Sequence, residues 1–167
     1  MKKLISIIFI LVVLVAGIFL YFRNVDNDVN YERFNMVAPG ILRTPVERFN
    51  NIVDYPFKEN YLIIGDTRIH YLDEGPKDGE IIYLLHGEPA WSYLFRKMIP
   101  ILTRAGYRVI APDMVGFGKS DKYVSIKDYS HQMHVDKMTQ LIVELDLNNV
   151  TAHVHDWGGL VGLRVIA

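Results

Sequence analysis

Three short segments of the sequence carry residue types that could do chemistry, and each follows a predicted strand. The last of them, which we call the elbow, is Val154-His155-Asp156-Trp157-Gly158-Gly159. A sharp strand-to-helix turn of this kind exposes one side chain, and small residues after it let the helix pack closely. A carboxylate is already ionised at neutral pH, so Asp156 could attack carbon directly and form an ester that water opens with the help of a separate base. The alternative, equally weighted on these residues alone, makes Asp156 an ordinary N-cap of the following helix.

The second segment is His86-Gly87-Glu88-Pro89-Ala90-Trp91, directly after the apolar run at residues 81–85. A loop at this place can direct a backbone N–H into a site, and together with the N–H after a nucleophile it forms an oxyanion hole. Glu88 and Trp157 would be the two donors. The alternative is a polar loop in which Glu88 only favours the N-terminus of the next helix.

The third segment covers residues 111–121 and contains Gly118-Lys119-Ser120. Its glycine spacing only partly matches a phosphate-binding loop, so we do not expect it to bind phosphate. We interpret Gly116 and Gly118 as turn residues. Asp113 is expected to be a structural carboxylate that accepts hydrogen bonds.

The elements that must position these segments alternate between strand and helix. Apolar runs predict strands at 61–64, 68–73, 81–85, 107–111 and 150–155. Helical spacing predicts helices at 92–105, where Pro100 lies inside the pattern, at 129–145 and from 158 onward. This alternation predicts an α/β fold, with a mainly parallel sheet covered on both faces and sites at the carboxyl ends of its strands.

The N-terminal residues predict a membrane anchor at 1–23. Nineteen uncharged residues run from Leu4 to Phe22 between two lysines and Arg23, and a spanning helix needs roughly 20 apolar residues. We expect an uncleaved single-pass anchor with the domain outside the cytoplasm, and a cleaved signal peptide on a secreted protein is the alternative. The polar, turn-forming residues 24–30 predict a tether, which we assign to 24–40, and 41–167 are predicted to be the domain.

Composition excludes several functions. Lys plus Arg number 18 and Asp plus Glu 19, giving a net charge of −1, so no basic block is present to bind nucleic acid. The absence of cysteine excludes disulfides, zinc–thiolate sites and a cysteine nucleophile. The sequence does not define the oligomeric state.

Taken in order, the three segments resemble the haloalkane dehalogenases of the α/β-hydrolase superfamily. The likeness covers residues 41–167 and rests on the elbow, on the stretch 86–100 and on the stretch 109–122. Each motif alone is shared with many α/β-hydrolases. The combination of Glu88 after His86-Gly87 with an Asp at the elbow is more specific.

This resemblance implies an α/β-hydrolase fold and a small organohalide substrate, with no metal or organic cofactor. Asp156 would displace the halide and form an alkyl-enzyme ester, and the indole N–H of Trp157 would bind the departing halide. The backbone N–H groups of Glu88 and Trp157 would stabilise the oxyanion when water opens the ester. The Glu88 side chain would help to orient that water.

Family members carry a base histidine, a partner carboxylate and a helical cap after the elbow, and this sequence ends at Ala167. We therefore expect the N-terminal part of a hydrolase domain with a truncated sheet, active only as part of a longer parent. Two alternatives stay open: an epoxide hydrolase with the same Asp nucleophile, and a non-catalytic membrane-tethered fragment. Four of the histidines that precede the elbow are expected to be surface or core residues rather than bases: His70, His131, His134 and His153.

Overall fold

The computed structural model describes residues 15–17 and 35–167, and the chain divides into two compact units, Met1–Arg33 and Phe34–Ala167. In the first unit, residues 15–17 are helical. Apart from those three residues, the predicted anchor lies outside the described part of the chain. Among the residues that are described, no helix has the length and apolar character needed to cross a membrane.

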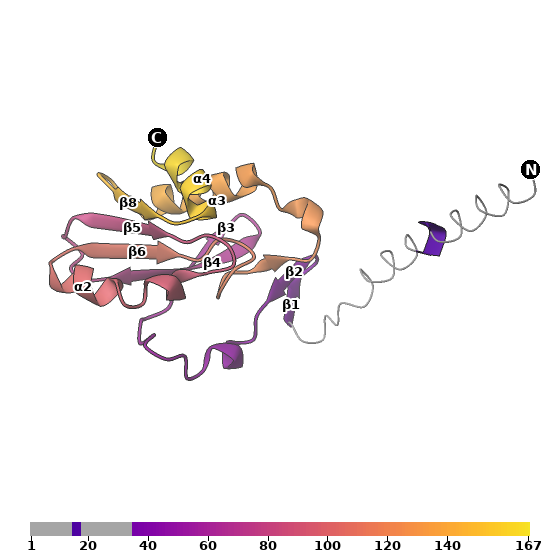
Figure 1. The fold of residues 1–167 in the computed structure, drawn as a ribbon, viewed down its shortest axis with the longest axis horizontal. Helices are drawn as coiled ribbons and strands as arrows, with labels where there is room; N and C mark the ends of the chain where they lie inside the picture. The colour runs from indigo at the N-terminus through magenta and orange to yellow at the C-terminus, as the bar shows by residue number, and fades with distance from the viewer. Residues whose placement is uncertain (1–14, 18–34) are drawn as a thin grey trace, which may run out of the picture. The chain divides into compact units, whose positions relative to one another are not determined.

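A five-stranded sheet forms the centre of the second unit, with strand order β3-β4-β6-β5-β8 (Figure 1). Its strands are β3 (Asn60–Ile64), β4 (Thr67–Glu74), β5 (Ile81–Leu85), β6 (Arg108–Pro112) and β8 (Thr151–Val154). β4 is antiparallel to both of its neighbours, whereas β5 is parallel to β6 and to β8. Four strands therefore share one direction, which confirms the predicted mainly parallel α/β sheet.

A second, three-stranded sheet is antiparallel and has the order β1-β2-β7. It consists of β1 (Asn35–Ala38), β2 (Ile41–Arg43) and β7 (Lys122–Tyr123). The sequence did not predict these strands, because two to four residues are too few to show a period of two. β1 lies within the stretch 24–40 that the sequence assigns to a tether.

Within residues 35–167, three α-helices and three short 3₁₀ helices lie between or after the strands. They are α2 (Ile99–Arg104), α3 (His131–Glu144), α4 (Trp157–Val165), η2 (Val46–Phe49), η3 (Ser92–Phe95) and η4 (Ile126–Asp128). The prediction of one continuous helix over 92–105 is wrong, since this stretch is divided into η3 and α2. Pro100 lies in the first turn of α2. A proline lacks the N–H that an interior position needs and its ring clashes with the preceding turn, so a helix accommodates it only near its start, and α2 begins at Ile99, one residue before Pro100.

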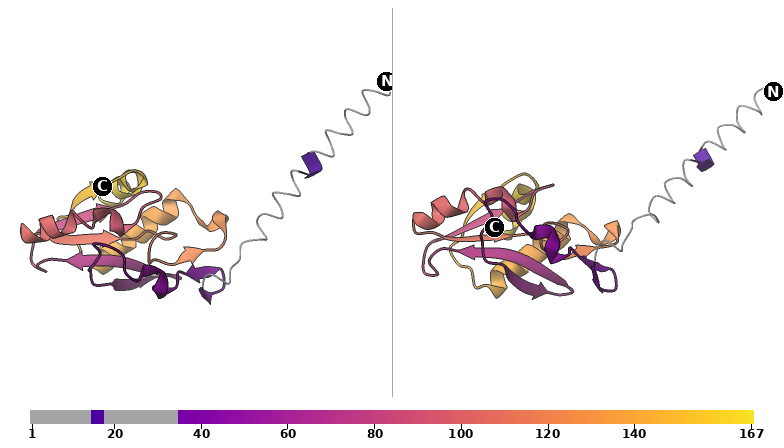
Figure 2. Two further views of the ribbon diagram at one scale, coloured as in Figure 1. Left: turned by 60° about the horizontal axis from the view of Figure 1, so that its bottom comes forward. Right: turned by 90° about the horizontal axis from the view of Figure 1, so that it is seen from below.

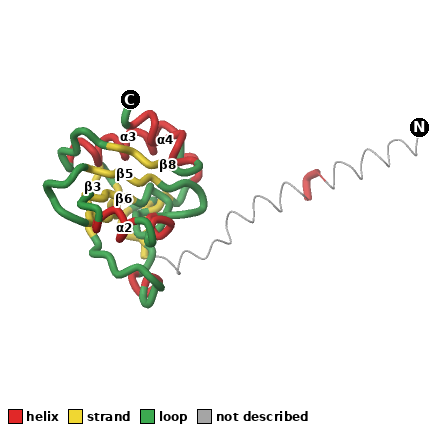
Figure 3. Tube along the Cα trace, turned by 60° about the vertical axis from the view of Figure 1, so that its left-hand side comes forward, coloured by secondary structure: helices red, strands yellow, loops and turns green. Residues whose placement is uncertain are grey.

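The sheet is covered on both faces, as Figures 2 and 3 show. On one face, Tyr83 and Leu85 of β5 pack in a core with Met138 of α3 and Val161 of α4. On the other face, Leu84 joins a second core together with residues of η3 and α2. Side chains alternate between the two faces along a strand, so the continuous apolar run of β5 fills both cores.

The three chemistry-bearing segments leave the sheet at the same edge. β5 and β8 are paired in register up to Leu85 and Val154, and the His155 N–H continues the ladder to the Leu85 carbonyl at 3.0 Å. Loop 86–91 and the elbow therefore start side by side. Loop 113–121 follows β6, the other neighbour of β5.

Candidate functional site

Asp156 lies on a strained turn between β8 and α4. Its backbone angles are φ 54° and ψ −125°, a conformation that residues with a Cβ rarely adopt and that is concentrated at functional sites. A Cβ added to Gly158 would stand 2.5 Å from the His86 carbonyl oxygen and closer still to that of Leu85. Only glycine therefore lets α4 start this close to β5. The predicted elbow is present.

The carboxylate of Asp156 faces the loop after β5. The backbone N–H of Glu88 donates to Asp156 Oδ1 at 3.0 Å. The backbone amide of Trp157 and then that of Glu88 hold the pKa of the Asp156 carboxyl below its ordinary value of 3.8. Asp156 is thus ionised at neutral pH, as a carboxylate nucleophile must be.

The capping alternative for Asp156 is not supported by its side chain. Asp156 occupies the N-cap position of α4, yet within residues 35–167 its side chain makes no capping hydrogen bond. Its hydrogen bond to the Glu88 N–H spans 68 positions of the chain. The carboxylate therefore connects the two segments that the sequence analysis placed in one site.

A cavity of about 440 Å³ opens beside the elbow. Glu88 and Trp157 both line it, together with apolar residues that include Phe117 and Val161. Trp157 is 44% exposed, and Asp156 is also exposed, so the described residues form an open cavity. The structure brings the three predicted site residues together, and their individual roles in a reaction stay predictions.

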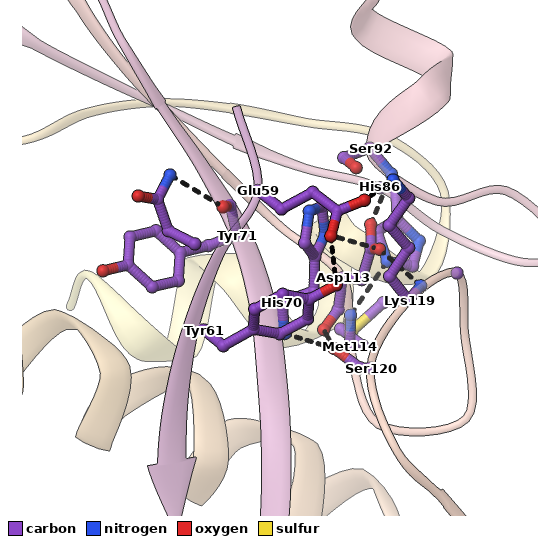
Figure 4. A network of polar contacts seen from close by, with 12 residues as sticks. Glu59, Tyr61, His70, Tyr71, His86, Ser92, Asp113, Met114, Lys119 and Ser120 are labelled. Carbon is purple, nitrogen blue, oxygen red and sulfur yellow. Dashed lines mark hydrogen bonds and ion pairs between the residues drawn. The ribbon is translucent and has the colours of Figure 1, made fainter. Parts of the chain in front are cut away.

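Asp113 has the structural role predicted for it (Figure 4). It is fully buried and lies close to His70 Nδ1 at 2.9 Å, to the Ser92 N–H at 2.7 Å and to the Lys119 N–H at 2.8 Å. Burial alone would raise the pKa of Asp113, but the hydrogen bond and charge interaction with His70, together with further contributions that include the Lys119 N–H, outweigh burial and lower it. The carboxylate thereby ties β4, η3 and the loop after β6 together.

The Gly-Lys-Ser segment forms no phosphate cradle. Gly116 and Gly118 have positive φ values of 96° and 44°, which confirms them as turn residues. Lys119 pairs with Glu59, and Lys122 donates to the carbonyls of Gly118 and Ser120.

Across residues 15–17 and 35–167, no group of three or more His, Cys, Asp or Glu side chains could hold a metal ion.

Two histidines line the cavity, a placement that the sequence analysis missed. His131 and His134 lie on the first turns of α3 and form part of the cavity wall. His131 Nε2 lies 3.1 Å from the Leu160 carbonyl, and burial lowers the pKa of His134 to about 4. Their spacing of three places both on one helical face, which is the signal that could have found them. His70 is buried and His153 exposed, as expected.

A family model described as "alpha/beta hydrolase fold" matches residues 80–167. The chain belongs to this family. The matched region begins just before β5 and includes loop 86–91, loop 113–121 and the elbow.

Named relatives of this α/β hydrolase confirm its resemblance to haloalkane dehalogenases. It is 58% identical over 132 residues to the haloalkane dehalogenase of Psychrobacter cryohalolentis and 57% identical to that of Mycolicibacterium paratuberculosis. Each match covers 76% of this chain and 44% of the relative. The chain therefore spans less than half the length of these relatives.

Among solved structures, a haloalkane dehalogenase and an epoxide hydrolase are both similar to this chain. The tetrameric haloalkane dehalogenase DpaA from Paraglaciecola agarilytica NO2 superposes with a TM-score of 0.71 at 49% identity, covering 74% of this chain and 43% of that protein. The epoxide hydrolase VrEH1 from Vigna radiata has a TM-score of 0.61 at 30% identity, covering 65% of this chain and 35% of that protein. The dehalogenase is thus the nearer of these two structures.

Proposed function

We propose that this α/β hydrolase cleaves the carbon–halogen bond of small organohalides through a covalent ester on Asp156. The observation that carries this proposal is the ionised Asp156 carboxylate on the strained elbow, with the Glu88 N–H 3.0 Å from Oδ1. The two haloalkane dehalogenases at 58% and 57% identity support it.

In the first step, a carboxylate oxygen of Asp156 attacks the carbon that bears the halogen. A carbon–oxygen bond forms, the carbon–halogen bond breaks, and its electron pair leaves with the halide ion. The indole N–H of Trp157, which lines the cavity, donates to the departing halide. A neutral donor in a largely apolar cavity stabilises a developing anion without adding charge of its own.

In the second step, water adds to the carbonyl carbon of the Asp156 ester. The backbone N–H groups of Glu88 and Trp157 hold the resulting oxyanion, and the Glu88 side chain orients the water. Collapse releases the alcohol and restores the carboxylate, so the sum is haloalkane plus water giving alcohol, halide and one proton. This step needs a base for the water.

A polypeptide limited to residues 1–167 is expected to stop at the ester. The resemblance places the base histidine after the elbow, and residues 157–167 contain no histidine. On the cavity wall, burial lowers the pKa of His134 to about 4, which makes it a weak base. One halide per chain and a stable mass increase are the expected result. Steady multiple turnover by that polypeptide would contradict this expectation.

Halide release from 1-bromobutane and 1-chlorobutane by the protein tests the proposal. Asp156→Asn is expected to abolish release, because a neutral amide is a poor nucleophile. The exposed Asp78 lies before β5, at the opposite end of that strand from loop 86–91, and Asp78→Asn is the matched control that should retain full release. Failure of the unmodified protein to release halide from any haloalkane would end the proposal.

Epoxide hydrolysis is the second candidate, and the similarity to VrEH1 at a TM-score of 0.61 favours it. The same Asp156 oxygen would open an epoxide carbon and the same ester hydrolysis would give a diol. Diol formation from styrene oxide without any halide release would replace the first proposal by this one. A folded protein that releases neither product would support the third option, a non-catalytic membrane-tethered module.

We also propose that residues 4–22 anchor the protein in a membrane with the domain outside the cytoplasm. The support is the uncharged run of nineteen residues between two lysines and Arg23. Because the chain has no cysteine, Asp78→Cys introduces a single thiol for an impermeant maleimide. Labelling in right-side-out but not in inside-out vesicles is expected. The reverse pattern, or protein released by carbonate washing, would overturn this topology.

A further inference from the structure

His86 contacts the peptide that carries the Glu88 N–H. The imidazole is completely buried. Its Nε2 accepts a hydrogen bond from the Met114 N–H at 3.0 Å, in the network of Figure 4, and its Nδ1 lies 3.0 Å from the Gly87 carbonyl oxygen. A neutral imidazole has one donor nitrogen and one acceptor nitrogen. Because the Met114 amide can only donate, Nε2 is the acceptor and Nδ1–H donates to Gly87.

One peptide unit connects His86 to Asp156. The Gly87 carbonyl and the Glu88 N–H belong to the same planar group, so holding the oxygen also fixes the direction of the N–H. That oxygen accepts from His86 Nδ1–H at 3.0 Å and from the Ala90 N–H at 2.9 Å. The N–H on the other side donates to Asp156 Oδ1 at 3.0 Å. Hydrogen bonds in such a chain polarise one another, which makes the Glu88 N–H a better donor.

The packing around the Gly87–Glu88 peptide restricts its position. A Cβ added to Gly87 would stand 2.6 Å from the Trp157 nitrogen, so the peptide lies directly against the elbow. The His86 ring is also held by the Phe117 ring, with centroids 5.3 Å apart. Burial lowers the pKa of His86, so the imidazole is neutral at pH 7 and keeps the donor and acceptor pattern described above.

Building on the proposed function, we propose that His86 is a positioning residue that aims the Glu88 N–H at the oxyanion of the Asp156 ester. Negative charge grows on the carbonyl oxygen only when water adds to the ester. In the preceding displacement, the charge moves from the carboxylate to the halide. His86 therefore serves ester hydrolysis and contributes little to alkylation.

Two substitutions separate the two hydrogen bonds of His86. His86→Asn places an amide N–H near the position of Nδ1 and keeps the donor to the Gly87 carbonyl. His86→Gln places an amide oxygen near the position of Nε2 and keeps the acceptor for the Met114 N–H, but it loses the donor to Gly87. The exposed His153 provides a control, His153→Gln, that touches neither bond.

Rapid-quench kinetics with 1-bromobutane measure halide release and ester decay in the same sample, and intact mass follows the butyl adduct. In the longer parent protein that the sequence analysis expects, His86→Gln should alkylate within about threefold of the unmodified protein but hydrolyse the ester roughly 10- to 100-fold more slowly, which approaches the loss of one oxyanion-hole donor. The butyl ester should therefore accumulate. His86→Asn is expected to recover much of the hydrolysis rate.

Two results would overturn the inference. One is ester hydrolysis in His86→Gln at the rate of the unmodified protein. The other is an equal fall of both steps in both His86 variants, which is the result expected of general damage to the fold.

A second measurement keeps the inference separate from the proposed function. If the unmodified protein is never alkylated, the proposed function fails, but the ¹H and ¹⁵N shifts of the Glu88 amide still report its hydrogen bond. These shifts should change in His86→Gln and change much less in His86→Asn. Identical Glu88 shifts in all three proteins would refute the positioning role on their own.

Discussion

The close approach of α4 to β5 gives the sharpest structural prediction, the substitution Gly158→Ala. The added Cβ would stand 2.5 Å from the His86 carbonyl oxygen and 2.8 Å from the Leu85 carbonyl carbon, where ordinary contact begins at 3.4 Å. Both neighbours are backbone at the end of β5 and the start of loop 86–91, so the start of α4 must move by roughly 1 Å. Overpacking of this kind costs about 1–3 kcal/mol of unfolding free energy, and we expect the upper part of that range.

Gly159→Ala is the matched control, because its added Cβ meets nothing nearer than a Val154 methyl at 3.9 Å. A helical Gly→Ala change without a clash stabilises by up to about 1 kcal/mol. Urea unfolding and alkylation by 1-bromobutane measure both consequences. Gly158→Ala should lose stability and alkylation, whereas Gly159→Ala should lose neither. Equal stability of the two variants would show that the tight contact between elbow and sheet has been misjudged.

Three further predictions concern a buried carboxylate, an ion pair and the indole. The pKa of the Asp113 carboxyl is lower in the folded protein than its ordinary value of 3.8, so the carboxylate stabilises the fold fully above that value and progressively less as pH falls through the folded-state pKa. Asp113→Asn should lower the free energy of unfolding at pH 7 by about 1–3 kcal/mol. In urea unfolding at a series of pH values, this variant should also lose less stability at acid pH. Arg43 donates hydrogen bonds of 2.7 and 2.9 Å to the buried Asp121, so Arg43→Met should lower the free energy of unfolding by roughly 2 kcal/mol. The control is Lys77→Met, at a side chain that is 65% exposed, which should lower it by less than about 0.5 kcal/mol in the same assay. Trp157→Phe keeps the backbone N–H and removes the indole N–H, so rapid-quench halide release should slow by at least ~10-fold while hydrolysis of the formed ester is unchanged. An unchanged halide burst would exclude the indole as the halide donor.

The sequence was sufficient to predict the central sheet and the elbow because their signals are local. The run at residues 81–85 is apolar at every position, which indicates a strand buried on both faces, and Leu84 and Leu85 do lie in opposite cores. Asp156 followed by two glycines predicted the turn, and the close approach of Gly158 to the carbonyls of Leu85 and His86 shows why a glycine is needed at that position.

Other features could not be predicted because they depend on partners distant in the sequence. The helix predicted at 92–105 is interrupted at residues 96–98, just before the first turn of α2 that contains Pro100. The apolar spacing favoured one continuous helix, whereas proline is restricted to the first turn, and the restriction prevailed. The role of His86 depends on Met114, 28 positions away, and no pattern in either segment indicates that pairing. The strands of the small sheet are likewise defined by pairing between β2 and β7.

The most direct test of the covalent role of Asp156 is peptide mapping after reaction with 1-bromobutane. For the polypeptide of residues 1–167, the predicted result is a single butyl group on the peptide that contains Asp156, formed with one equivalent of bromide and absent from Asp156→Asn. Bromide release with no butyl group on Asp156 under rapid quench, or a butyl group on another side chain, would contradict the proposed mechanism.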